Sequence, residues 1–190
     1  MDQNEKRILK IEHWITLASL VVAVAVLLTN LWYFHGRAVQ EHQINSANQV
    51  MALYDRYYFS PSMTRERKKM SGHLLRHDPI DLMEYEFLDR FEMLGLLTRR
   101  GVIDPYIAWS MFESAVENYY KALTSLPDST NYLKQIREKN HDSSLYQEFE
   151  WLNNCFLNLS QQSEHRGAVP TDEEVMRFLK DENRGTEGSK

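Results

Sequence analysis

Glu92 is the residue whose type and position first suggest chemistry. It lies at the edge of an apolar stripe with helical spacing, and a carboxylate in such a place needs a partner because an unpaired buried charge is costly. Arg99, Arg100 and Arg137 are the candidate partners. We expect a structural ion pair rather than a general base, since no His, Ser or Cys nucleophile pattern accompanies Glu92.

A second pattern is the pair His73 and His77. Four residues apart, they place two imidazoles on one face of a predicted helix, and this spacing is able to bind a divalent metal. No glutamate stands between them as it does in metalloproteases, and Pro79 is expected to end the helix before Asp81 joins the pair. We therefore expect two solvated histidines rather than a metal site, and no cofactor.

The remaining reactive or charged groups favour structural roles. Phosphate-binding loops of the GxGxxG and GxxxxGK types are absent. The one cysteine, Cys155, lies close to Leu152 and Phe156, which predicts an inert thiol in a core. The basic run 65–69 and the acidic residues of 78–89 predict solvated helix faces, with lipid headgroups and calcium as the respective alternatives.

The elements that position these groups are helices, because apolar residues recur at steps of three and four and no segment alternates with a period of two. After the apolar run near the N-terminus, the helix is expected either to extend or to resume as a stalk, until Ser60-Pro61 ends it. The helical patterns cover 14–34 with its continuation 38–59, then 63–77, 80–100, 105–126, 132–139, 145–159 and 171–179.

Local signals mark where several of these helices begin. Asp78-Pro79 and Asp104-Pro105 each supply an N-cap followed by proline in the first turn. Residues 144–147 and 171–174 each fit a capping box. The helices before and after residues 101–104 are joined closely enough to pack as an antiparallel hairpin. We predict an all-α fold, with a single N-terminal transmembrane helix followed by an antiparallel helical bundle.

Several short matches resemble one protein family. They are FLDRFEMLGLLTRRGVID, a Trp109-bearing helix with paired tyrosines, IRE at 136–138 and YQEFEWL at 146–152. These stretches, within roughly 82–152, resemble a bacterial family of unknown function whose members are small proteins with an N-terminal transmembrane segment and a helical domain. The resemblance implies this architecture and a shared surface around its central pattern, and it implies no activity, substrate or cofactor. The pattern comprises Glu92, Leu94, Gly95, Arg99, Arg100, Gly101 and Asp104.

The uncharged run 14–34 decides where the protein resides. Its twenty-one residues span roughly 30 Å as a helix, which matches the hydrocarbon thickness of a bilayer. Trp14 at one end and Trp32 to Phe34 at the other suit the two interfaces, and no small-residue cleavage site follows. We expect an uncleaved single-pass anchor in the cell inner membrane, with the lipid bilayer as a partner.

Basic residues near the span favour a cytoplasmic N-terminus. Lys6, Arg7 and Lys10 precede the span, whereas Arg37 follows it closely, and the positive-inside tendency counts basic residues near the ends. The bulk of the chain would then lie outside the cytoplasm. The opposite topology stays open because further basic residues lie downstream in 56–69.

The part of the chain beyond the anchor suits one domain, since about 150 residues bury one core comfortably and two poorly. The expected organisation is a basic N-terminal tail (1–13), the span (14–34), a helical stalk (35–60), a helical domain (61–182) and a disordered tail (183–190). The net charge of −5, with basic and acidic residues interspersed, excludes the basic face on which a nucleic-acid binder depends.

Two functions fit these features. The first is a membrane-anchored helical interaction module that presents its bundle to a protein partner or to a second copy in a homo-oligomer. The alternative is a membrane-tethered enzyme or effector with a polar site around Glu92 and Arg99. A convergence of those polar groups in a pocket would favour the enzyme.

Overall fold

The computed structural model describes residues 3–78, 82–126, 131–163 and 169–184. The described residues form helices without any strand, and they confirm the all-α class. The chain divides into two units, residues 1–45 and 46–190. The helices are α1 (Gln3–Phe59), α2 (Pro61–Arg76), α3 (Leu82–Arg99), α4 (Pro105–Thr124), α5 (Tyr132–Asn140), α6 (Gln147–Gln162) and α7 (Asp172–Arg184).

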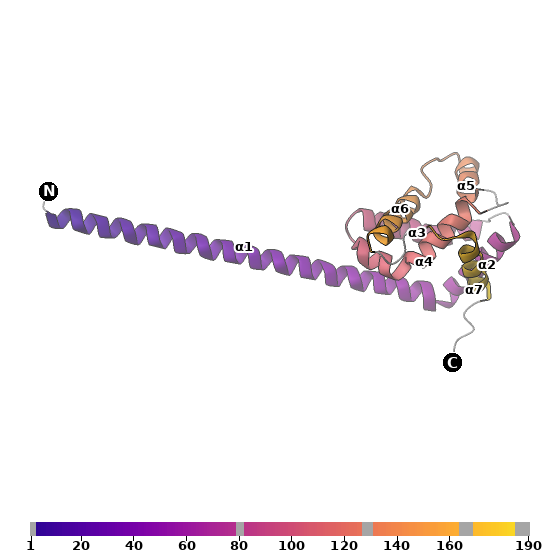
Figure 1. Ribbon diagram of the computed structural model, residues 1–190, viewed down its shortest axis with the longest axis horizontal. Helices are drawn as coiled ribbons and strands as arrows, with labels where there is room; N and C mark the ends of the chain where they lie inside the picture. Colours follow the sequence, from indigo (N-terminus) through magenta and orange to yellow (C-terminus); the bar gives the residue numbers. More distant parts are fainter. Residues whose placement is uncertain (1–2, 79–81, 127–130, 164–168, 185–190) are drawn as a thin grey trace. The chain divides into compact units, whose positions relative to one another are not determined.

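The described residues of the first unit, 3–45, all lie on α1, the long helix of Figure 1. The helix passes Gly36 without a break, so it extends rather than resumes, and it ends at Phe59, immediately before Ser60-Pro61 as expected. Within the described residues it is the one helix long and apolar enough to cross a membrane, and its apolar window is not buried. The Trp14 side chain, expected at one interface, lies outside the described side chains.

The last part of α1 belongs to the second unit and contributes to its core. Val50 and Tyr57 are buried there, and Leu53 and Tyr54 pack against the same cluster. The ring of Tyr57 lies 5.8 Å from that of Phe91 on α3, measured between centroids. Residues 46–59, which the sequence assigns to a stalk, are therefore also a core helix of the domain.

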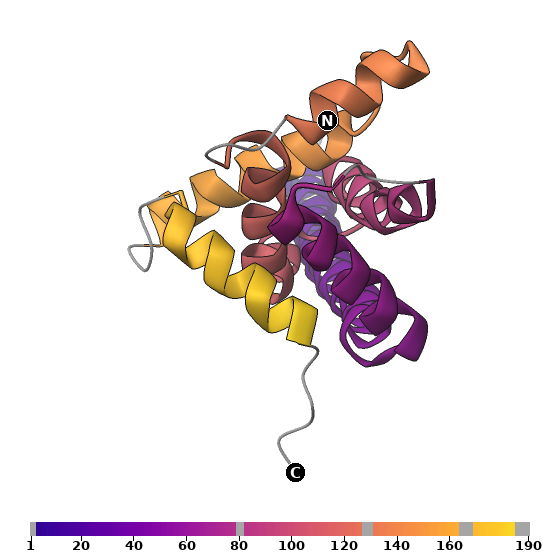
Figure 2. The same cartoon turned by 90° about the vertical axis from the view of Figure 1, so that its right-hand side faces the viewer.

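The second unit is a bundle in which α3 packs most extensively on α6 and α2 on α7, while α4 contacts α3, α5, α6 and α7. Figure 2 shows α7 running beside α2 and α4. The hairpin of α3 and α4 forms, but its contact is smaller than the one between α3 and α6. The core is rich in aromatic rings; those of Phe91 and Phe149, for example, stack 4.9 Å apart.

Two helix boundaries in this unit follow from local chemistry. Asp104 caps α4 as predicted, because its carboxylate accepts hydrogen bonds from the backbone N–H groups of Tyr106 and Ile107. Thr171 and Glu174 form the predicted reciprocal capping box at the start of α7. The other predicted Asp-Pro cap includes Pro79, which lies outside the described residues.

The predicted capping box at 144–147 is wrong. Helix α6 begins at Gln147, and its N-cap is Tyr146, which has a left-handed backbone with φ of 60° and no side-chain cap bond. The Ser144 hydroxyl instead donates to the carboxylate of Asp142. The tyrosine is held by tertiary contacts, since its hydroxyl lies 3.2 Å from a carboxylate oxygen of Asp89 on α3. Long-range bonding therefore overrides the local sequence preference here.

Candidate functional site

Glu92 caps α6 from a different helix. Its Oε2 atom accepts a hydrogen bond of 2.8 Å from the backbone N–H of Phe149, and the N–H of Glu148 also bonds to this carboxylate. These donors belong to the first turn of α6, where the N–H groups have no partner within the helix and the helix dipole attracts negative charge. The acidic side chain expected to pair with an arginine thus bonds to backbone donors instead.

Gly95 lies one turn after Glu92 and faces the same end of α6. A Cβ atom at this position would overlap the carbonyl oxygen of Glu148. The absence of a side chain therefore allows α3 to approach the start of α6 closely enough for Glu92 to reach its N–H groups. The two residues together hold the N-terminal end of α6 against α3.

Arg99 and Arg137 bind the same turn from outside. The Arg99 guanidinium lies 3.0 Å from the Glu148 carboxylate and rests over the ring of Trp151. Arg137, on α5, donates to the carbonyl oxygen of Leu145 at 2.8 Å and to the carboxylate of Glu150 at 2.9 Å. Arg99 therefore holds the start of α6 itself, whereas Arg137 holds both α6 and the segment that leads into it.

Arg100 and Gly101 have a different place, at the end of α3. Gly101 has a left-handed backbone with φ of 69°. Its N–H bonds to the carbonyl of Thr98 and that of Val102 to the carbonyl of Leu97, which is the Schellman pattern of helix termination. Arg100 is exposed at this corner. Of the residues proposed from sequence, Glu92, Gly95, Arg99 and Arg137 meet at one place, while Arg100 and Gly101 end α3.

The chemistry of this cluster is that of helix docking. Burial raises the pKa of Glu92 above its ordinary value, although the two N–H bonds and the charge of Arg137 oppose the shift. Its carboxylate is nevertheless occupied by backbone donors, and the arginines are occupied by carboxylates and carbonyls. A general base needs an open position for the proton it removes, and the contacts of Glu92 supply a structural role instead.

The two histidines do not share a regular helical face. Helix α2 ends at Arg76, and His77 has a left-handed backbone with φ of 57°, so the step of four residues from His73 is interrupted. Asp81 lies outside the described residues. Within the part of the chain that the structure describes, no three His, Cys, Asp or Glu side chains gather as metal ligands do.

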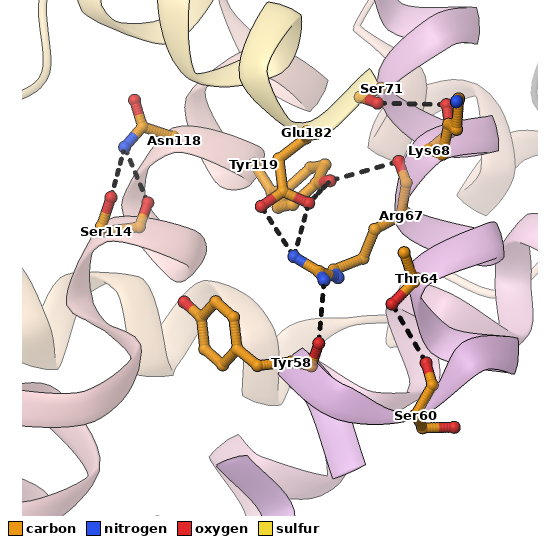
Figure 3. A network of polar contacts seen from close by, with 10 residues as sticks. All are labelled: Tyr58, Ser60, Thr64, Arg67, Lys68, Ser71, Ser114, Asn118, Tyr119 and Glu182. Carbon is orange, nitrogen blue, oxygen red and sulfur yellow. Dashed lines mark hydrogen bonds and ion pairs between the residues drawn. The ribbon is translucent and has the colours of Figure 1, made fainter. Parts of the chain in front are cut away.

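A second polar cluster, which the sequence did not reveal, joins α2 to α7. Arg67 donates from Nη1 to both carboxylate oxygens of Glu182, each at 2.9 Å, and the Tyr119 hydroxyl lies 3.5 Å from Glu182, as Figure 3 shows. The two charged side chains are only 6% and 11% exposed. The basic run 65–69 is thus not wholly a solvated face: Arg67 is buried, whereas Arg65 and Lys68 are exposed.

Aromatic rings and backbone complete this cluster. The Arg67 guanidinium lies over the rings of Tyr57 and Tyr58, at 5.0 and 5.2 Å from their centroids, and it also reaches the carbonyl oxygen of Tyr58. Cation–π contact of this kind favours a buried guanidinium. Burial raises the pKa of Glu182 above its ordinary value, with Arg67 acting in the opposite direction. No sequence signal pairs Arg67 with a residue 115 positions away.

A family model described as "Domain of unknown function (DUF4760)" matches residues 14–155. The chain belongs to this family. The match includes the apolar part of α1 and all the residues around Glu92, and it ends before α7. No curated protein and no solved structure matches the chain. The resemblance to an uncharacterised family that the sequence motifs suggested is therefore confirmed as DUF4760 membership.

Proposed function

We propose that the protein is a membrane-anchored helical module that presents its bundle to a protein partner or to a second copy. The observation that carries this proposal is the exposure of the apolar part of α1. The large apolar side chains from Leu20 to Phe34 are 48% to 81% exposed, and a surface of that size is unfavourable in water. A bilayer removes it from water along the whole span.

The polar cluster around Glu92 supports an interaction role over catalysis. Its charged groups hold α6 in place, so they are committed to backbone and carboxylate partners rather than directed at a substrate. An interaction module needs a rigid surface, and a capped, closely seated helix provides one. The proposal therefore assigns the Glu92 cluster to the stability of the surface.

The proposed location is the cell inner membrane with the N-terminus in the cytoplasm. Support comes from Lys6, Arg7 and Lys10 before the apolar run, against Arg37 close behind it. The helical domain is then on the outer side of the membrane and meets partners there.

Carbonate extraction followed by protease treatment tests the anchor and its orientation. We expect the full chain to stay in the membrane pellet at high pH, and a C-terminal tag to be removed by protease added to intact spheroplasts. Release by carbonate contradicts the anchor. A tag that is cut only after lysis contradicts the proposed orientation and leaves the anchor standing.

Photo-crosslinking from the domain surface tests the interaction role. A photoreactive residue in place of the exposed Tyr106, and in turn at other exposed positions of the domain, is expected to give a discrete adduct with a protein in the membrane fraction. The buried position Phe149 is the matched control and is expected to give none. Failure of every exposed position to form an adduct would contradict the interaction role.

A further inference from the structure

The seat beneath α7 combines charged side chains and aromatic rings. It is built from α2 and α4, with the α1 rings of Tyr57 and Tyr58 against Arg67, and it holds α7 through the Arg67–Glu182 pair. We propose that this seat is a docking groove for an amphipathic helix, that α7 is its built-in occupant, and that a partner helix of the same chemistry displaces α7. The inference rests on the proposed interaction role and names the surface and the class of partner.

The groove recognises a helix at several points along its length. An added Cβ at Gly72 of α2 would come within 2.9 Å of the Asn183 side chain, so α7 contacts α2 at this glycine. Towards the other end of α7, Lys121 of α4 forms an ion pair of 2.6 Å with Asp172. Between them, Arg67 supplies a cation that is buried and aimed at α7. These contacts define a groove with fixed charge positions.

The face of α7 that enters the groove is narrow. Val175 and Leu179 are fully buried, and Glu182 follows at the next helical step, which gives the spacing i, i+4 and i+7. Phe178 packs edge-on against the Tyr119 ring at 5.1 Å between centroids. Arg177 and Lys180 lie on the exposed side. A helix that fits this groove therefore presents two branched aliphatic side chains followed by a carboxylate.

The bonding in the groove makes α7 displaceable rather than permanent. Burying both members of an ion pair costs desolvation that their attraction offsets only in part. Among the described residues, Arg67 Nε and Tyr57 Oη are buried without a hydrogen-bond partner, and such groups oppose burial. The fully buried apolar contribution of α7 is limited to Val175 and Leu179. These costs oppose the docking of α7, and a competing helix that replaces α7 exploits them.

The family match covers the groove but not α7. Arg67, Gly72, Tyr119 and Lys121 lie inside the matched residues 14–155, whereas α7 begins at Asp172. These groove residues therefore lie within the DUF4760 match, and α7 lies outside it. A partner that carries the same aliphatic, aliphatic, acidic spacing would meet a preformed site with complementary charge.

Fluorescence anisotropy with a labelled peptide of residues 171–184 tests the proposal on the full chain in detergent. The chain variant Leu179→Ala loosens its own α7 and leaves the groove intact. We expect it to bind the peptide at least tenfold more tightly than the wild-type chain does. Lys180→Ala, on the exposed side of α7, is the matched control and is expected to behave like the wild type. Should Leu179→Ala fail to fold, Phe178→Ala replaces it.

The peptide itself provides the second test. A Glu182→Ala peptide cannot bond to Arg67, and we expect it to bind the Leu179→Ala chain at least tenfold more weakly than the wild-type peptide. Equal affinity of the two peptides, or no gain in affinity from either loosened chain, overturns the groove. Because carbonate extraction and the crosslinks from other surfaces do not depend on α7, that result would leave the proposed function intact.

Discussion

Gly95 of α3 lies directly against the backbone of Glu148 in α6. A Cβ atom at Gly95 would overlap the Glu148 carbonyl oxygen and also contact the carbonyl carbon. The obstruction is backbone rather than a flexible side chain, and it belongs to the turn that Glu92 caps. The glycine and the carboxylate therefore act together, because the cap needs the close approach.

Gly95→Ala is expected to destabilise the domain. Alanine favours a helix over glycine by about 1 kcal/mol, but displacing the first turn of α6 costs more, so we expect a net loss of about 2 kcal/mol. The corresponding fall in melting temperature is roughly 5 °C. Thermal unfolding followed by circular dichroism checks this, with Gly36→Ala as control, since an added Cβ at Gly36 meets nothing within 4 Å. A melting temperature that rises in Gly95→Ala would refute the steric argument.

Glu92→Ala is expected to cost about 1 kcal/mol, because it removes the acceptor for the N–H groups at the start of α6. Glu92→Gln keeps a side-chain oxygen in place and should lose less than half as much. Chemical denaturation of both variants at neutral pH measures the difference. An equal loss in the two variants would point to an ion pair, in which the charge itself matters, and would remove the capping interpretation.

The pH dependence of stability offers a separate test of Glu92. Burial is the largest influence on this carboxyl and raises its pKa in the folded state, so the folded state holds the proton more tightly than the unfolded state does. Below the unfolded pKa of about 4.3, Glu92 makes its full contribution to the free energy of unfolding. That contribution is lost as the pH rises through the pKa that Glu92 has in the folded state. Wild type should therefore lose unfolding free energy relative to Glu92→Gln on going from acidic to neutral pH. Parallel pH profiles would contradict this.

The sequence predicts those parts of the fold whose cause is local or periodic. Asp104 caps α4 because its own side chain reaches N–H groups two and three residues on, and the apolar steps of α6 place Phe149 and Leu152 in the core. The uncharged run near the N-terminus is recognised as a candidate membrane span from its length and composition alone. In each case the cause lies within a few residues along the chain, or in the apolar core or bilayer that the side chains enter.

The partners that the sequence did not reveal are distant or carry no signature. Glu92 bonds to a backbone N–H 57 residues away, and backbone groups are the same at every position, so residue types pointed to arginines instead. In the sequence, Arg67 is one of several cations in a basic run that is expected to be exposed. Only the structure shows that Arg67 pairs with Glu182. Tyr146 adopts its left-handed backbone through tertiary contacts, which a local capping pattern does not record.

Arg67→Lys tests whether geometry or charge alone holds α7. Lysine keeps the charge but loses the planar guanidinium that bonds to Glu182 while lying over Tyr57 and Tyr58. We expect faster amide hydrogen exchange throughout α7, by roughly tenfold or more, which corresponds to about 1.4 kcal/mol.

Exchange in α3 and α6 should stay unchanged in Arg67→Lys, because the bonds that join those helices are made by Glu92 and Arg99. Arg65→Lys is the matched control, since Arg65 is an exposed cation on the same helix and its substitution should leave exchange in α7 as it is. If Arg67→Lys protects α7 as well as the wild type does, a single positive charge suffices and the guanidinium geometry is unimportant. If exchange instead accelerates equally in α3, α6 and α7, the helix is a cooperative part of the core rather than a separately docked element.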